Sequence, residues 1–158
     1  MVTAQRTLTI NAAFLLEIKE DNRELRQLLD DCASLLSRPH RAGVELRRVA
    51  QLLGKLRDQL AMHFSLEEAY GYFDDAIDVA PRLSRQAGAL RSQHPRLFVA
   101  LCDLVEEAEQ LLYHERPPLE LDDLASGFAR FHRELQDHEA QEDALIVKVF
   151  NEEIGGGD

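Results

Sequence analysis

Apolar residues return along this chain at intervals of three and four positions, which is the spacing of one face of an α-helix. Four segments carry the pattern, and they run over residues 15–36, 46–70, 83–111 and 121–149. No alternation typical of a β-strand competes with them. Helices of roughly 25 to 30 residues joined by short connections are typical of bundles. We therefore predict an all-α fold, an antiparallel up-down-up-down four-helix bundle.

Residues that interrupt helices separate the four segments. The connections read "SRPHRAG", "GYFDDAIDVAP" and "HERPPLE", and each contains proline or glycine. We expect an N-terminal arm over residues 1–9, the bundle over residues 10–151 and a flexible tail over residues 152–158.

The composition fits one globular domain with a sizeable core, because 45% of the 158 residues are hydrophobic and 30% are charged. A formal net charge of −11 argues against nucleic acid as a partner. No apolar run approaches the roughly 18 residues of a membrane span, and no signal peptide is evident. Cys32 and Cys102 lie at apolar helical positions. We expect buried free thiols and a cytoplasmic location.

Polar residues interrupt the apolar pattern at a few positions only. They are Asn22, His63, Glu67, His94, His138 and Glu142. Burying a neutral polar group without a partner costs roughly 2–7 kcal/mol, and a carboxylate costs more. A fold has only about 5–15 kcal/mol of net stability. We therefore expect these side chains to meet one another.

The positions of the loops support that expectation. Residues at the same height of an antiparallel hairpin lie equally far from its turn. Gly43 lies midway between Asn22 and the 63/67 pair, and Pro117 lies midway between His94 and the 138/142 pair. The remaining midpoint falls beside Pro81. The polar positions therefore share one layer of the predicted bundle.

Three histidines and two glutamates in a dry core favour a metal site. A spacing of four places His63 and Glu67 on one helical face, and His138 and Glu142 repeat the arrangement. Each imidazole can hold one ion while the carboxylate one turn away bridges two ions. Mixed nitrogen and oxygen donors suit iron or manganese better than structural zinc.

The order of the residues distinguishes two kinds of bundle. Ferritin-like proteins use Glu-x-x-His, whereas this chain has His-x-x-x-Glu twice. The pieces "EDNRELRQLL", "HFSLEEAYGYF", "SQHPRLF" and "HEAQEDALI" together resemble the hemerythrin-like, or HHE cation-binding, family over about residues 10 to 150. The resemblance implies a non-haem di-iron protein that binds O₂, NO or a peroxide, or that senses or handles iron. Oxygen carriers of the family have a further histidine on helix three, but Leu90 and Phe98 stand four residues either side of His94 here.

One position departs from the family pattern, because Asn22 stands where the family has a histidine on helix one. The resemblance then implies two irons, or a single metal held mainly by His94, His138 and the two glutamates. The metal is iron or another divalent ion. Glu139 is a weaker candidate for an additional ligand. Glu68 and Asp143 each follow a bridging glutamate, and their roles stay open between orienting a ligand and lying at the surface. Tyr70 is expected to pack in the core.

Two other classes of function are weighed against metal binding. Asn22 motivates a metal-free or single-metal bundle that acts as a regulatory or interaction module. An enzyme is less favoured, since no nucleophile–base set, phosphate loop or zinc-hydrolase motif occurs. Neither a protein partner nor an oligomeric state can be inferred from the sequence.

Overall fold

The structure is a computed structural model, and it describes residues 22–38, 42, 44–69, 81–115, 117 and 120–155. Within these residues it contains four long α-helical segments, isolated helical residues at positions 42 and 44, and no strand. The first helix covers residues 22–36, and it is followed by α3 (Leu46–Ala69), α5 (Ser84–Leu112) and α6 (Leu121–Gly155). A short 3₁₀ turn, η1 (Pro81–Leu83), leads directly into α5.

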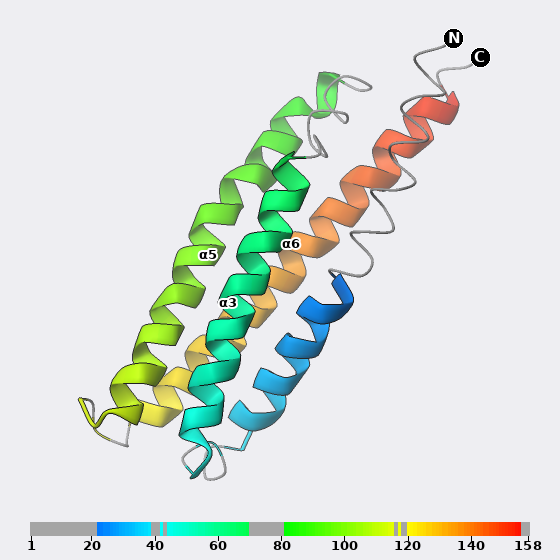
Figure 1. Ribbon diagram of the computed structural model, residues 1–158. Helices are drawn as coiled ribbons and strands as arrows, with labels where there is room; N and C mark the ends of the chain where they lie inside the picture. Colours follow the sequence, from blue (N-terminus) through cyan, green and yellow to red (C-terminus); the bar gives the residue numbers. More distant parts are fainter. Residues whose placement is uncertain are drawn as a thin grey trace.

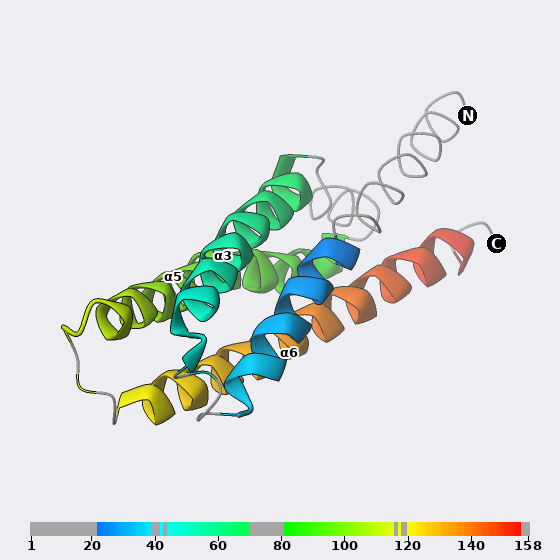
Figure 2. The same ribbon diagram turned by 60° about the horizontal axis from the view of Figure 1, so that its bottom comes forward.

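The helices run in alternating directions. In Figure 1 the sequence colours descend the first helix, ascend α3, descend α5 and ascend α6. Helix α5 packs against both α3 and α6, and the view in Figure 2 shows the first helix beside α6. The prediction of an all-α, up-down-up-down four-helix bundle is confirmed.

Among the described residues, the core is divided into two apolar parts of unequal size. The larger part draws on all four helices, with fully buried leucines such as Leu25, Leu53, Leu101 and Leu135. The smaller part consists of Ala87, Leu90 and Leu145, with Leu83 packed against it. Fully burying a leucine contributes roughly 1.5–3 kcal/mol, so among the described residues the larger part contributes more apolar stabilisation than the smaller part.

A buried polar layer lies between the two parts. Along α5, His94 separates Leu90 of the smaller part from Leu97 of the larger part. Along α6, His138 and Glu142 occupy the same position between Leu135 and Leu145. The interruptions read from the sequence therefore form a layer of the folded bundle.

Helix α5 continues through Pro95, which immediately follows His94. Proline has no backbone N–H and normally bends or ends a helix. Here Leu90 and Leu97 on either side of it are both buried, and the proline itself is exposed. Burial of the apolar face thus maintains the helix across this position.

The ends of the last two helices have local causes. Helix α5 ends in backbone bonds from Tyr113 to Glu109 and from Glu115 to Gln110, with His114 at a φ of 60°. This is the left-handed closing residue common at helix ends. Helix α6 has Asp122 and Asp123 in its first turn, where negative charge is favourable.

The observed end of the last helix differs from the boundary expected for the bundle. Helix α6 has 35 residues and reaches Gly155, so it is longer than expected and passes the boundary set at residue 151. The division into arm, bundle and tail stays a prediction. Residues 1–9 and Tyr70 lie outside the described residues.

Candidate metal centre

Three helices bring five buried polar side chains together. Helix α3 supplies His63 and Glu67, α5 supplies His94, and α6 supplies His138 and Glu142. None of the five residues is more than 4% exposed. Such burial of carboxylates is unusual unless they are paired or bind a cation.

Each glutamate lies close to the histidine one turn before it. His63 Nε2 is 2.8 Å from Glu67 Oε1, and His138 Nε2 is 2.5 Å from Glu142 Oε1. This is the geometry expected for residues four apart on one helix.

The histidine of α5 joins the two pairs. His94 Nε2 lies 3.2 Å from Glu67 Oε2 and 3.3 Å from Glu142 Oε1. Both carboxylates therefore face the same imidazole nitrogen, and the two His–Glu pairs form one cluster. The five side chains meet as the loop midpoints predict.

The outward nitrogens of two rings have partners of their own. His138 Nδ1 lies 2.8 Å from Gln93 Oε1, and His94 Nδ1 lies 3.2 Å from Glu68 Oε1. Because an amide oxygen and a carboxylate oxygen can only accept, Nδ1 carries the hydrogen and donates it in both rings. If these rings are neutral, their Nε2 lone pairs point at the carboxylates of Glu67 and Glu142.

A cation suits this arrangement better than the side chains alone do. Glu67 Oε2 and His138 Nε2 are buried and have no hydrogen bond of good geometry, although an oppositely charged or polar atom lies near each. One donor atom from each of Glu67, His94, His138 and Glu142 lies within 4.8 Å of the others. Two imidazoles and two carboxylates are a donor set suited to iron or manganese. The residues therefore fit a metal ion.

In the metal-free chain, neighbouring charges set the protonation of the cluster. Burial opposes ionisation of Glu67, but the neighbouring imidazoles of His63 and His94 prevail and lower its pKa from 4.5 to about 2. Burial also opposes ionisation of His94, yet the nearby carboxylates of Glu142 and Glu67 raise its pKa from 6.5 to about 9. The free cluster is thus held as an imidazolium between carboxylates.

Phe64 closes one side of the cluster. Its ring stacks on His94 with centroids 3.9 Å apart and planes 7° apart, and it meets His138 edge-on at 5.9 Å. It is 6% exposed and belongs to the larger apolar part of the core. The histidines are therefore adjacent to hydrocarbon on this side.

The other candidate residues lie around this cluster. Asn22 is half-buried at the described start of the first helix. Glu139 is also half-buried, and burial raises its pKa while the His63 charge opposes the rise. Glu68 contacts His94, which settles one role that the sequence leaves open. Asp143 is exposed, with a pKa raised by partial burial and by Glu142.

Sequence reasoning missed Gln93 and Phe64. Neither lies at a position counted in the apolar pattern. Both are direct neighbours of cluster histidines in the chain, and that adjacency is the signal that points to them.

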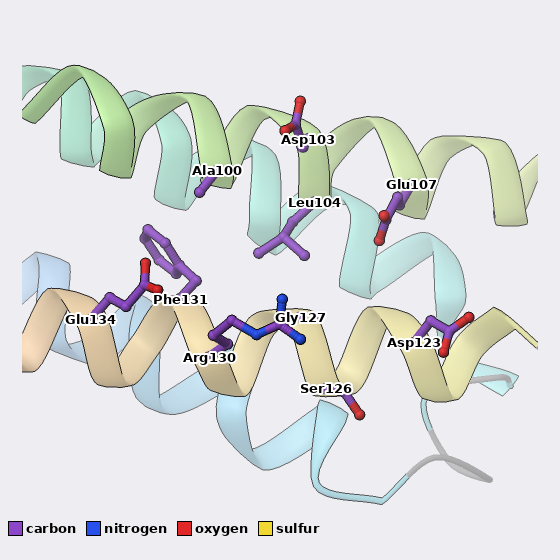
Figure 3. A pocket seen from close by; sticks show the side chains of 10 residues that line it. All are labelled: Ala100, Asp103, Leu104, Glu107, Asp123, Ser126, Gly127, Arg130, Phe131 and Glu134. Carbon is purple, nitrogen blue, oxygen red and sulfur yellow. The ribbon is translucent and has the colours of Figure 1, made fainter.

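A separate surface hollow lies between α5 and α6 (Figure 3), with a volume of about 390 Å³. Leu104 and Phe131 point into it, and Arg130 lies along it among acidic side chains such as Glu107. None of the five cluster residues lines it.

Comparison with known proteins agrees with the geometry of the cluster. The family model described as the hemerythrin HHE cation binding domain matches residues 14–97, which is more than half of the chain. This chain belongs to the hemerythrin HHE family. The match includes His63, Glu67 and His94 but ends before the His138–Glu142 pair, which the spacing and the structure supply. Searches of curated proteins and of solved structures gave no match.

Two further features concern the helices and the cysteines. No helix in the described part of the chain has the length and apolar character needed to cross a bilayer. Cys32 is buried and Cys102 is partly buried, and both are free thiols. Burial raises the pKa of the Cys32 thiol to about 12, so this thiol is unreactive near neutral pH.

Proposed function

We propose that this protein binds non-haem iron in the buried cluster and uses it to sense or bind O₂, NO or a peroxide, or to handle iron. The observation that carries the proposal is the direction of the imidazoles. His63, His94 and His138 all present Nε2 to the two carboxylates, while Nδ1 of His94 and His138 is held from outside. Histidines that bind metals commonly have this outer hydrogen bond.

The cluster offers donors for two metal ions, and the donor set for the first ion is stronger than that for the second. His94 and His138, with Glu67 and Glu142, would hold one ion, and these are the four residues whose donor atoms converge. His63 would hold a second ion through the same two carboxylates, with Asn22 and Glu139 as weaker donors. An amide oxygen binds transition metals less well than an imidazole does. The second ion should therefore bind more weakly than the first.

The protein's own contribution is geometry and exclusion of water. Iron, when bound, would supply electrons to a small molecule or bind it reversibly. The side chains orient the donors, and Phe64 with the surrounding leucines keeps the cluster dry. The free thiols suit a reducing compartment such as the cytoplasm.

A second candidate function is a metal-free regulatory or interaction module. The imidazolium–carboxylate contacts of His94 favour it, because they can hold the cluster together without an ion. Two buried atoms would then remain without hydrogen bonds, which counts against it.

Elemental analysis of untagged protein, purified without added metal, separates the two candidates. The proposal expects between about one and two irons per chain, and loss of most of this iron in a Glu67→Gln/Glu142→Gln double variant. Glu134→Gln, an exposed change on α6, is the matched control and should retain the iron. A folded wild-type protein with no metal would leave the interaction module as the better account.

A further inference from the structure

The two outer hydrogen bonds of the cluster differ in their acceptors. His138 Nδ1 donates to the amide oxygen of Gln93, which is neutral, over 2.8 Å. His94 Nδ1 donates to the carboxylate of Glu68 over 3.2 Å, and that side chain is 41% exposed. The neutral acceptor is the closer and the more buried of the two.

The two acceptors occupy related places in the bundle. Glu68 directly follows Glu67 on α3 and reaches His94 on α5. Gln93 directly precedes His94 on α5 and reaches His138 on α6. Helices α3 and α5 therefore each contribute a cluster residue and, beside it in sequence, the group that orients an imidazole on the next helix of the cluster. The backbone that positions a cluster residue therefore also positions the hydrogen-bond acceptor of a histidine on another helix.

The contact between Gln93 and His138 determines which nitrogen of the ring carries the hydrogen. With Nδ1–H bound to the amide oxygen, a neutral His138 has its lone pair on Nε2. That atom is buried, has no hydrogen bond, and lies 2.5 Å from Glu142 Oε1. A lone pair and a carboxylate oxygen repel each other unless a cation lies near both.

We propose that Gln93 is the positioning residue for His138, and that its amide oxygen fixes the tautomer and ring direction that keep Nε2 available to a metal ion. The inference rests on the proposed function for the metal, but the tautomer itself can be observed without one. The difference between the two outer acceptors also makes His94 and His138 unequal in donor strength. A carboxylate behind His94 increases the donor strength of that ring, whereas a neutral amide behind His138 leaves the site with less negative charge.

The test uses two variants and a matched control on the same helix. Gln93→Leu removes the acceptor, whereas Gln93→Glu keeps an acceptor oxygen and adds charge. Gln110→Leu is the control, since Gln110 is also half-buried on α5 and bonds to Glu106 instead. Thermal unfolding shows whether each variant is folded.

The first readout is the ¹⁵N spectrum of His138 in metal-free protein, at a pH where the shifts report a neutral ring. The wild type and Gln110→Leu should show the hydrogen on Nδ1. Gln93→Leu should move part of the population to the Nε2–H tautomer, and Gln93→Glu should retain the wild-type form. A wild-type ring with its hydrogen on Nε2 would overturn the proposal, even if Gln93→Leu does not fold.

The second readout is the affinity for Co²⁺, measured by titration. Loss of the outer partner should weaken binding by about 10- to 100-fold in Gln93→Leu, with Gln93→Glu and Gln110→Leu close to or above the wild type. Equal affinity in Gln93→Leu and the wild type would also contradict the proposal. If the wild type binds no metal at all, the proposed function fails, while the tautomer still decides the role of Gln93.

Discussion

The ring of Phe64 lies flat against the ring of His94, with centroids 3.9 Å apart and planes 7° apart. Phe64 therefore belongs to two environments, the leucine core on one side and the polar cluster on the other. Removing it should affect both stability and the position of His94.

Replacement of Phe64 by alanine should destabilise the protein by about 3–5 kcal/mol, because it leaves a cavity in a packed core. Phe128→Ala is the matched control, since Phe128 is 2% exposed in the same core and should cost a similar amount. Denaturant unfolding measures both losses. Only Phe64→Ala should shift the His94 ring-proton resonances and weaken metal binding. Equal His94 spectra in the two variants would show that the stacking does not position the ring.

His63 and His94 should each affect the binding of a different metal ion. His63→Ala should reduce bound iron to about one ion per chain, because His63 serves only the second ion in the proposed assignment. His94→Ala should reduce the affinity of the first ion, since His94 faces both carboxylates. Iron analysis after equilibrium dialysis measures the effect.

His132→Ala is the control for these variants. His132 is half-buried on α6 and contacts Phe128 rather than the cluster. The assignment would be wrong if His63→Ala and His94→Ala lost the same ion, or if His132→Ala lost either.

Asn22→His should strengthen binding of the second ion. The change would supply an imidazole on the first helix, where the family pattern has one, and imidazole is the better ligand for iron. Competition with a chelator under anaerobic conditions measures the affinity. Arg23→His places the same side chain one residue away at an exposed position and should change nothing. An unchanged second affinity in Asn22→His would mean that position 22 does not face the second ion.

The stability of the metal-free protein should pass through a maximum in mildly acidic solution. His94 has a folded pKa of about 9 against 6.5, so its stabilising effect is complete below pH 6.5 and is lost as the pH rises through about 9. Glu67 has a folded pKa of about 2 against 4.5, so its effect is present above pH 4.5 and is lost as the pH falls through about 2.

Urea unfolding of chelator-treated protein between pH 2 and 10 measures this dependence. Replacement of His94 by glutamine should remove much of the alkaline decline and leave most of the acid decline. A free energy of unfolding that increased steadily from pH 6.5 to 9 would contradict the predicted charge state of His94.

The bundle and its polar layer could be predicted because both follow from burial. Leu90 and Leu97 define the buried face of α5, and a histidine between them on that face has to find partners inside the protein. The family match alone would not have supplied the His138–Glu142 pair, which lies beyond residue 97.

The outer contacts could not be predicted in the same way. Gln93 and Phe64 lie beside the positions counted in the apolar pattern, and their contacts depend on how α3, α5 and α6 are rotated toward one another. The sequence does not determine the role of Glu68, because a partly exposed side chain can reach either the solvent or His94, and its rotamer decides between them. The extension of α6 to Gly155 was missed because the apolar spacing ends before it.

The most direct test of the central claim is an anaerobic titration of chelator-treated protein with ferrous ion, followed by thermal unfolding at each addition. A ligand that binds only the folded state stabilises it by about 2.7 kcal/mol at a hundred times its dissociation constant. The account predicts a rise in Tm that saturates between about one and two ions per chain, and that is absent in the Glu67→Gln/Glu142→Gln variant. A well-folded wild type whose Tm does not change with ferrous ion would contradict the assignment of the buried cluster as a metal site.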